Sequence, residues 1–127
     1  MKLLSFQFGE LKHGWSQFKI ITDVKELCWE ISDVPRDPFA EFETALSKII
    51  NGLDMDDIYM FLEPQILILK YDSLESKLVI SLEGITQAEI NVNITEMAYF
   101  ISMSLKRVYS DNSNAYHDKN WSYPIPL

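Results

Sequence analysis

The residues of this sequence that are able to do nucleophilic or acid–base chemistry are few and far apart. The 127-residue chain has two histidines, His13 and His117, and one cysteine, Cys28. A cysteine–histidine pair would need the fold to bring these segments together, and nothing around Cys28 marks a reactive thiol. We therefore expect Cys28 to be a half-buried structural residue and both histidines to lie in loop or tail segments.

The acidic residues match no metal-binding or catalytic motif. Segment 54–57 (DMDD) lacks the regularly spaced oxygen ligands, the glycine and the closing glutamate of a calcium-binding loop. Glu30 and Glu63 fall on predicted strands and could form a carboxylate pair, but any acidic protein offers such pairs. Nucleophile-elbow, P-loop and dinucleotide-binding motifs do not occur in the sequence. The sequence thus predicts no enzymatic activity, no cofactor and no metal site.

The negative charge is concentrated in one part of the chain. The segment from Glu26 to Glu63 has ten acidic and two basic residues, so it accounts for the whole formal net charge of −8. Such a field repels nucleic acids and anionic membranes and accelerates association with a basic protein. Solubility is the alternative explanation of an acidic composition. The candidate partner-binding residues are Glu30, Asp33, Asp37, Glu41, Glu43, Asp54, Asp56 and Asp57.

A helix is predicted in the middle of this acidic segment. Asp37 is a good N-cap, Pro38 suits the first helical position, and Gly52 is typical of a helix end. Glu41 and Glu43 lie off the apolar side and should face water. The apolar stripe that we expect to pack inside the fold consists of Phe39, Phe42, Leu46, Ile49, Ile50 and Leu53.

Alternation of apolar and polar residues predicts strands on both sides of this helix. Leu4, Phe6 and Phe8 should share one face of the first strand, and Trp29 should lie in the core. Glu63-Pro64 leaves open a hairpin or a single bent strand. The predicted strands are 3–8, 15–21 and 26–32 before the helix, and 58–62, 65–71, 77–83 and 86–94 after it.

A second helix is predicted after the last strand, with Thr95 as N-cap and with Ile94 and Tyr99 as a hydrophobic staple. Phe100 and Met103 lie off its main apolar stripe, which is typical of a well-buried helix or of an interface. Trp15 and Trp121 either anchor the fold or add exposed binding area, and anchoring is the role that we expect.

The order βββ-α-ββββ-α describes an α+β protein with a single, largely antiparallel sheet and two helices packed on one face. We expect a single domain over residues 1–127, in which residues 110–127 form a loop and a tail packed on the surface. One cysteine allows no internal disulfide and suits a reducing compartment. Without a signal-peptide core or an apolar run of bilayer length, we expect a soluble, cytoplasmic protein.

Three stretches of sequence point to a family. They are His13-Gly14-Trp15 at the entry to the second strand, DPFAEFETAL over residues 37–46, and the joint at residues 62–64 (LEP). In these features the protein resembles the small acidic α+β immunity proteins of bacterial contact-dependent and polymorphic toxin systems. The resemblance implies a stoichiometric inhibitor that binds its cognate toxin, often a basic nuclease, in the cytoplasm.

The sequence therefore favours a non-catalytic protein-binding domain of the immunity type, with a basic toxin domain as its partner and an acidic surface as its binding site. One alternative is a small-molecule binder or enzyme with a pocket between sheet and helices that uses His13, Cys28 or paired acids. The other is a homo-oligomeric module joined through Phe100 and Met103 of the second helix. The sequence leaves the oligomeric state open, a homodimer included.

Overall fold

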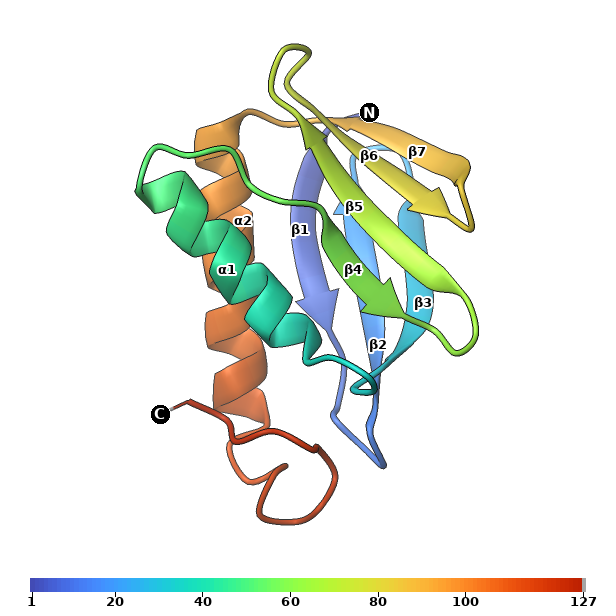
Figure 1. Ribbon diagram of the computed structural model, residues 1–127, viewed down its shortest axis with the longest axis vertical. Coiled ribbons are helices and arrows are strands. Elements are labelled where there is room, and N and C mark those ends of the chain that lie inside the picture. Colours follow the sequence, from blue (N-terminus) through green and yellow to red (C-terminus); the bar gives the residue numbers. More distant parts are fainter. Residues whose placement is uncertain (127) are drawn as a thin grey trace.

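A computed structural model of the protein describes residues 1–126 and contains one seven-stranded antiparallel sheet with two helices on one side of it (Figure 1). The strands stand in the sheet in their sequence order. They are β1 (Leu3–Phe8), β2 (Trp15–Thr22), β3 (Glu26–Ser32), β4 (Ile58–Phe61), β5 (Ile66–Asp72), β6 (Lys77–Leu82) and β7 (Ile85–Asn91). Helix α1 (Pro38–Ile50) joins β3 to β4, and α2 (Ile94–Asp111) follows β7. The predicted α+β architecture is confirmed.

Tight turns connect most of the neighbouring strands. His13 and Gly14 have φ angles of 54° and 81°, and Glu83 and Gly84 have φ angles of 50° and 77°. Two successive residues with positive φ form the turn whose twist matches that of an antiparallel hairpin, and glycine adopts the second position without strain. Between β4 and β5 the amide of Leu62 donates to the carbonyl of Gln65 at 2.8 Å, so this joint is a hairpin and not a bent strand.

The sheet is nearly divided between β3 and β4, which share the single residue pair Ser32–Phe61. Its two ends approach each other, because Lys2 pairs with Asn91 and the Asn91 amide donates to the Met1 carbonyl at 2.7 Å. The fold therefore consists of two antiparallel meanders, β1–β3 and β4–β7, which curl around a common interior.

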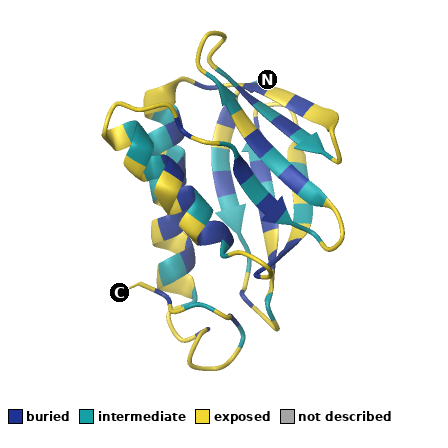
Figure 2. Cartoon of the chain, viewed as in Figure 1, coloured by how far each residue is buried: buried dark blue, intermediate teal, exposed yellow. Residues whose placement is uncertain are grey.

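One hydrophobic cluster fills that interior, and Figure 2 shows buried residues alternating with exposed ones along the strands. Its centre is a group of phenylalanine rings from β1, β2 and α1. The ring centroids of Phe8 and Phe39 are 4.9 Å apart, and those of Phe6 and Phe42 are 5.4 Å apart. These contacts hold α1 against β1 and so fix the direction in which its outer face points.

Three expectations about strand residues are wrong. Leu4 is 49% exposed and does not share the face of Phe6, because the pairing of β1 with β2 shifts between Leu3 and Ser5. Trp29 is only half-buried, since among residues 1–126 no strand flanks most of β3 on the side away from β2. Cys28 is exposed and not half-buried, because its side chain lies on the face of β3 opposite the core.

The prediction that the apolar stripe of α1 packs inside the fold is wrong for its last residues. Phe39, Phe42 and Ala45 are buried, but Ile50 and Leu53 are 72% and 60% exposed. Figure 1 shows the C-terminal end of α1 extending away from the sheet, so Ile50 is exposed although Ile49 still packs against the core. The predicted stripe therefore packs inside the fold as far as Leu46 and Ile49, which are half-buried, and fails only at Ile50 and Leu53.

Helix α2 begins two positions earlier than predicted, with a different cap. The Asn93 side chain accepts a hydrogen bond from the Glu96 amide at 2.8 Å, and Glu96 Oε1 accepts one from the Asn93 amide at 3.2 Å. This reciprocal pair is a capping box, which satisfies two otherwise unpaired amides, so Asn93 and not Thr95 is the N-cap. Tyr99 is 60% exposed and forms no staple with Ile94.

The C-terminal tail is fixed to the surface by one aromatic residue. Helix α2 continues to Asp111, two residues into the predicted loop. Beyond it, Trp121 is 2% exposed, and its ring stacks on that of Phe39 with centroids 5.1 Å apart. The anchoring role expected for Trp121 is confirmed, whereas Trp15 is 36% exposed. Residue 127 lies outside the described part of the tail.

Candidate functional site

The acidic surface expected to bind a partner begins at the N-terminus of α1. Asp37 is the N-cap of this helix, and its Oδ1 accepts a hydrogen bond from the Phe39 amide at 3.0 Å. Burial raises the pKa of Asp37 above its ordinary value, and hydrogen bonds from Phe39 and Ala40 oppose that rise. Asp37 therefore stabilises the helix and offers only part of its carboxylate to a partner.

Glu41 is already engaged within the protein. Its Oε1 accepts the amide of Tyr59 at 3.2 Å and lies 3.6 Å from the guanidinium of Arg36. Arg36 in turn lies over the rings of Tyr59 and Phe61, at 5.7 and 6.0 Å from their centroids. The carboxylate of Glu41 thus replaces the missing strand partner of β4 at Tyr59.

Glu43 accepts a hydrogen bond from the hydroxyl of Tyr109 on α2. Burial raises the pKa of Tyr109 well above its usual range, and the negative charge of Glu43 raises it further. Tyr109 also meets the ring of Phe39 edge-on at 5.8 Å. Glu43 is therefore an exposed acid with a second role, which is to join the two helices.

The connection from α1 to β4 contributes the remaining acids of this surface. Asp56 forms an ion pair with Lys48, whose Nζ is 2.6 Å from Oδ2. Among residues 1–126, the side chains of Asp54 and Asp57 take part in no hydrogen bond or ion pair. These two carboxylates are consequently the ones most available to an external cation.

Two of the eight candidate acids lie apart from the others. Asp33 is 2% exposed, so it cannot contribute to a surface, and its Oδ2 accepts the Ser122 amide at 2.8 Å. This contact fixes the tail against the end of β3 and explains why the expected surface position of Asp33 is wrong. Glu30 is exposed on the outer face of β3.

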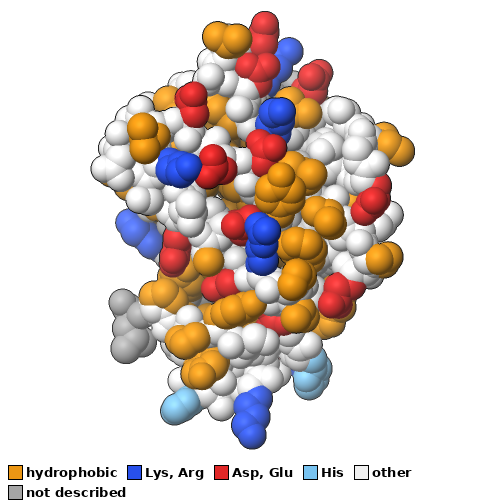
Figure 3. Space-filling model, in the orientation of Figure 1, with side chains coloured by type: hydrophobic (Ala, Val, Ile, Leu, Met, Phe, Trp, Pro, Cys, Tyr) orange, Lys and Arg blue, Asp and Glu red, His pale blue; other side chains and the backbone are white. Residues whose placement is uncertain are grey.

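The structure thus gathers six of the eight candidates along α1 and its connection to β4. A helix rises about 1.5 Å per residue, so the 13 residues of α1, which separate Asp37 from the acids of the connection to β4, span roughly 20 Å. Figure 3 shows acidic side chains distributed over this part of the surface with basic side chains between them. Glu41 is directed toward β4 and Glu43 toward α2, so the six acids lie along this part of the chain on more than one side of the helix. We call this group the acidic ridge, and its members are Asp37, Glu41, Glu43, Asp54, Asp56 and Asp57.

A band of apolar side chains lies beside the acidic ridge. Tyr59 and Phe61 on β4 stand opposite Ile68 and Ile66 on β5, and all four are half-buried on the face turned away from the core. Figure 3 shows hydrophobic side chains along this face. Partly exposed aromatic and apolar groups beside charged ones are the composition of a protein-binding surface.

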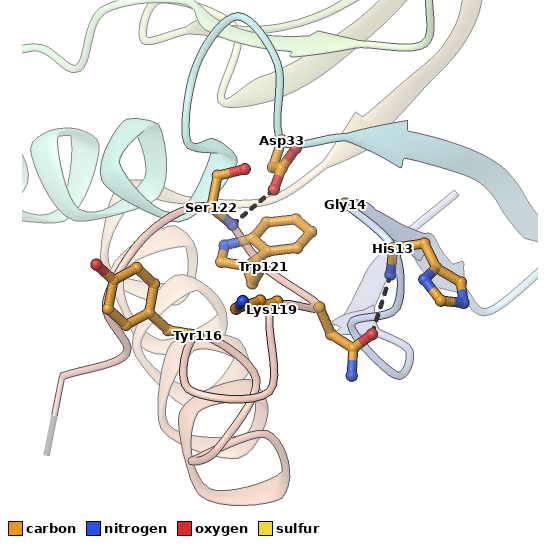
Figure 4. Close-up of a pocket in the computed structure, with 8 residues that line it drawn as sticks. His13, Gly14, Asp33, Tyr116, Lys119, Trp121 and Ser122 are labelled. Atoms are coloured by element: carbon orange, nitrogen blue, oxygen red, sulfur yellow. Dashed lines mark hydrogen bonds between the residues drawn. The ribbon is translucent and has the colours of Figure 1, made fainter.

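A separate open depression of about 550 Å³ lies where the tail meets the β1–β2 turn (Figure 4). Figure 4 shows the Asp33 carboxylate held by the Ser122 amide, and the imidazole of His13 pointing away from it. His13 is held through its backbone amide, which donates to Asn120 Oδ1 at 3.3 Å. The depression therefore lies between the tail and the sheet, and His13 and Asp33 on its lining do not pair with each other.

The other residues considered for catalysis do not converge. His13 contributes to the depression of Figure 4 and to a second one near Trp15, and Cys28 lines neither. His117 is exposed on the tail. Within residues 1–126 no three side chains of the metal-binding types are grouped so that they could hold an ion. The geometry of the described residues offers an acidic and apolar surface.

Sequence reasoning missed the residues that complete this surface. In the sequence, Arg36 is recognisable only as one of the two basic residues of the acidic segment. Its position over Tyr59 and Phe61 depends on the loop that leads into α1. The bond between Glu43 and Tyr109 joins residues 66 positions apart. The alternation of Tyr59 and Phe61 with buried Ile58 and Met60 was the one available signal for the apolar band.

Comparison with known proteins adds no family. No protein-family model matches the sequence, and no curated protein and no solved structure shows a significant match to the chain. In the part of the chain that the structure describes, neither helix has the length and apolar character needed to cross a membrane.

Proposed function

We propose that this protein is a non-catalytic protein-binding domain of the immunity type. It binds a cognate basic toxin domain, of which a nuclease is one example, and neutralises it by covering its surface in the cytoplasm. The observation on which the proposal rests is the segregation of charge: the chain segment that includes the acidic ridge accounts for the full formal net charge of −8.

The charges of the acidic ridge divide into two groups. Glu41, Glu43 and Asp56 already have partners within the protein, whereas Asp54 and Asp57 have none within the described residues. Bringing a basic side chain to an acid that is unpaired among the described residues does not first require an internal bond to break. Asp54 and Asp57 therefore steer and fix the partner, and the engaged acids add to the long-range field.

The apolar band supports the same proposal from a different direction. Charge alone accelerates encounter but gives little net affinity, because exposed ion pairs contribute only about 0–1 kcal/mol. Most of the binding energy in protein interfaces comes from a few aromatic and arginine residues at their centre. Tyr59, Phe61 and Arg36 have those properties and lie beside the acidic ridge.

The test is protection of bacteria from a toxin. The probe is the C-terminal domain of the protein encoded immediately upstream of this gene, expressed with and without the present protein. We expect the domain to stop growth, growth to be restored by coexpression, and the two purified proteins to form a one-to-one complex. A domain that remains toxic in the presence of this protein, or that is not toxic by itself, overturns the proposal.

A pair of matched double variants tests the acidic ridge. Asp54→Asn with Asp57→Asn should lower the association rate with that domain about fivefold at low salt, because two unpaired charges are lost from the ridge. Glu75→Gln with Asp118→Asn removes the same charge from outside the ridge and should have a much smaller effect. Equal rates for the two variants, or a wild-type rate that is indifferent to salt, would exclude electrostatic steering by the ridge.

Self-association is a second candidate function, favoured by the outer side of α2. Tyr99, Met103 and Leu4 are 60%, 45% and 49% exposed, and with Phe100 and Arg107 they line a groove of about 180 Å³ between α2 and β1. A second copy of the chain could cover this apolar area. Light scattering over a range of concentrations decides: a dimer that Met103→Glu dissociates supports this candidate, and a monomer at every concentration removes it.

A further inference from the structure

Strand β3 has a largely unpaired edge where the sheet is nearly divided between β3 and β4. It pairs with β2 over its whole length, from Glu26 to Ser32. On its other side it pairs with β4 through Ser32 alone. The edge from Glu26 to Ile31 therefore has no neighbouring strand within residues 1–126, which is the situation in which a sheet can accept an additional strand.

The direction of the backbone groups of β3 follows from three hydrogen bonds. The Asp33 amide donates to the Gly14 carbonyl at 2.9 Å, and the Thr22 amide donates to the Lys25 carbonyl at 3.0 Å. Antiparallel pairs alternate between hydrogen-bonded and non-hydrogen-bonded residues, so every second residue of β3 turns its amide and carbonyl away from β2. The Gln17 carbonyl agrees, since it accepts from Gly9 at 2.7 Å on the β1 side. The outward-pointing residues are Glu26, Cys28, Glu30 and Ser32.

The pairing of Ser32 with Phe61 confirms this direction, because Ser32 can reach β4 only with outward-pointing groups. The amides and carbonyls of Glu26, Cys28 and Glu30 have no backbone partner among the described residues. The side chains of all three are exposed. Three consecutive outward positions on β3 thus present donors and acceptors, in ladder spacing, to solvent.

We propose that this edge binds an extended, basic segment of a partner protein as an additional strand next to β3. Glu26 and Glu30 stand four residues apart on the outer face of β3, with Cys28 between them. In the added strand, residues opposite these two acids would be lysine or arginine. Residues between them would be apolar, because they face the half-buried side chains of Leu27 and Trp29.

A second copy of β3 does not suit this edge. Antiparallel pairing of two such strands about Cys28 would place Glu26 of each copy opposite Glu30 of the other, and like charges directly opposite each other destabilise a sheet. Lys19 compensates Glu26 only weakly, since Nζ and Oε2 are 3.9 Å apart and both side chains are partly exposed. The charge of the edge therefore selects a basic strand.

This inference deepens the proposed function and rests on it, because it assigns to the toxin domain a basic strand that pairs with β3. The first experiment does not need the toxin. The probe is the peptide Thr-Lys-Val-Thr-Val-Lys-Thr, titrated into the isotopically labelled protein and followed by NMR. We expect the amide signals of Cys28 and Glu30 to shift and their hydrogen exchange to slow. No shift, or shifts confined to other strands, would overturn the proposal.

Two comparisons separate strand addition from simple attraction of charges. The same peptide with glutamate in place of lysine should not bind. Cys28→Pro removes one outward-pointing amide while the pairs of Leu27 and Trp29 with β2 stay intact, and it should lower the affinity for the lysine peptide about tenfold. Cys28→Ala retains the amide and should bind as the wild type does. Equal affinities of these two variants would contradict strand addition.

The outcomes of the two proposals are distinguishable. If the toxin domain is neutralised but the Cys28 and Glu30 amides exchange equally fast in the complex and in the free protein, the β3 edge is not its binding site and the inhibitor function stands. If the basic peptide protects these amides but the upstream domain is not neutralised, the strand-accepting edge stands and the inhibitor function fails.

Discussion

The hydroxyl of Tyr109 on α2 donates a hydrogen bond to the carboxylate of Glu43 on α1. One of the acids expected to meet a partner therefore also holds the two helices together. Burial and the charge of Glu43 raise the pKa of Tyr109 far above the 10.0 of a free tyrosine. Its contribution to stability is thus fully present below about pH 10 and is lost as the pH rises further.

Tyr109→Phe should lower the free energy of unfolding by about 1 kcal/mol at neutral pH, because one hydrogen bond to a partly exposed acid is lost. The variant should also lose less stability than the wild type above pH 10. Urea unfolding measured across the alkaline range tests both expectations. The matched control is Tyr116→Phe on the exposed tail, and equal alkaline slopes for the two variants would contradict the role of Tyr109.

Two variants of Asp37 should separate its role as the N-cap of α1 from the effect of its negative charge. Asp37→Ala removes the N-cap of α1 and should cost about 1 kcal/mol, whereas Asp37→Asn retains a cap acceptor and should cost much less. Because the pKa of Asp37 is raised above 3.8, its protonated form is favoured by folding. The stability of the wild type relative to Asp37→Asn should therefore fall as the pH rises from below 3.8 through the pKa of the folded protein. Chemical unfolding at acidic and neutral pH measures this difference, and a constant difference would argue against it.

Trp121 should be the main anchor of the tail. Trp121→Ala should lower the free energy of unfolding by about 3 kcal/mol, since it removes a buried ring from the face of Phe39. In a chain of this size that loss corresponds to roughly 10 °C in Tm. Trp121→Phe should cost less, because Nε1 of the buried indole has no hydrogen-bond partner among residues 1–126. Thermal unfolding followed by circular dichroism compares them, and equal losses would mean that ring stacking does not hold the tail.

Gly14 should tolerate alanine less well than Gly84. Both have a positive φ, of 81° and 77°, so alanine strains both backbones by about 1 kcal/mol. A Cβ on Gly14 would also lie 2.9 Å from Asp33 Oδ1, whereas nothing lies within 4 Å of a Cβ on Gly84. Gly14→Ala should therefore be the more destabilising change in a urea titration. The reverse order would show that the Asp33 side chain can move away from the added methyl group without loss of stability.

The fold was largely predictable because its signals are local. Alternation set every strand to within a few residues, and Asp37 with Pro38 set the start of α1. The errors arise where the burial of a residue depends on an element that is distant in the sequence. Periodicity cannot show that α1 runs beyond the sheet at Ile50, or that β3 lacks a neighbour beside Trp29.

The candidate site was less predictable for the same reason. Net charge located the acidic ridge, but charge counting cannot tell a free carboxylate from an engaged one. The sequence predicts an exposed Asp33, but its carboxylate is buried and accepts the amide of Ser122, which lies 89 positions away in the sequence. Glu41 likewise acquires Tyr59 only when α1 docks beside β4. Tertiary contacts, which no local pattern encodes, decide which acids remain available.

The sequential order of the strands has a consequence for how quickly the chain folds. Each strand pairs with its sequence neighbour, so most of the sheet forms by closing short loops, which costs little entropy and gives fast folding. The tail is one exception: the Ser122 amide donates to Asp33 and the His13 amide donates to Asn120, across 89 and 107 positions. Because contacts of such long separation cost more loop-closure entropy, we expect them to form after the transition state. The tail should then slow unfolding more than it speeds folding.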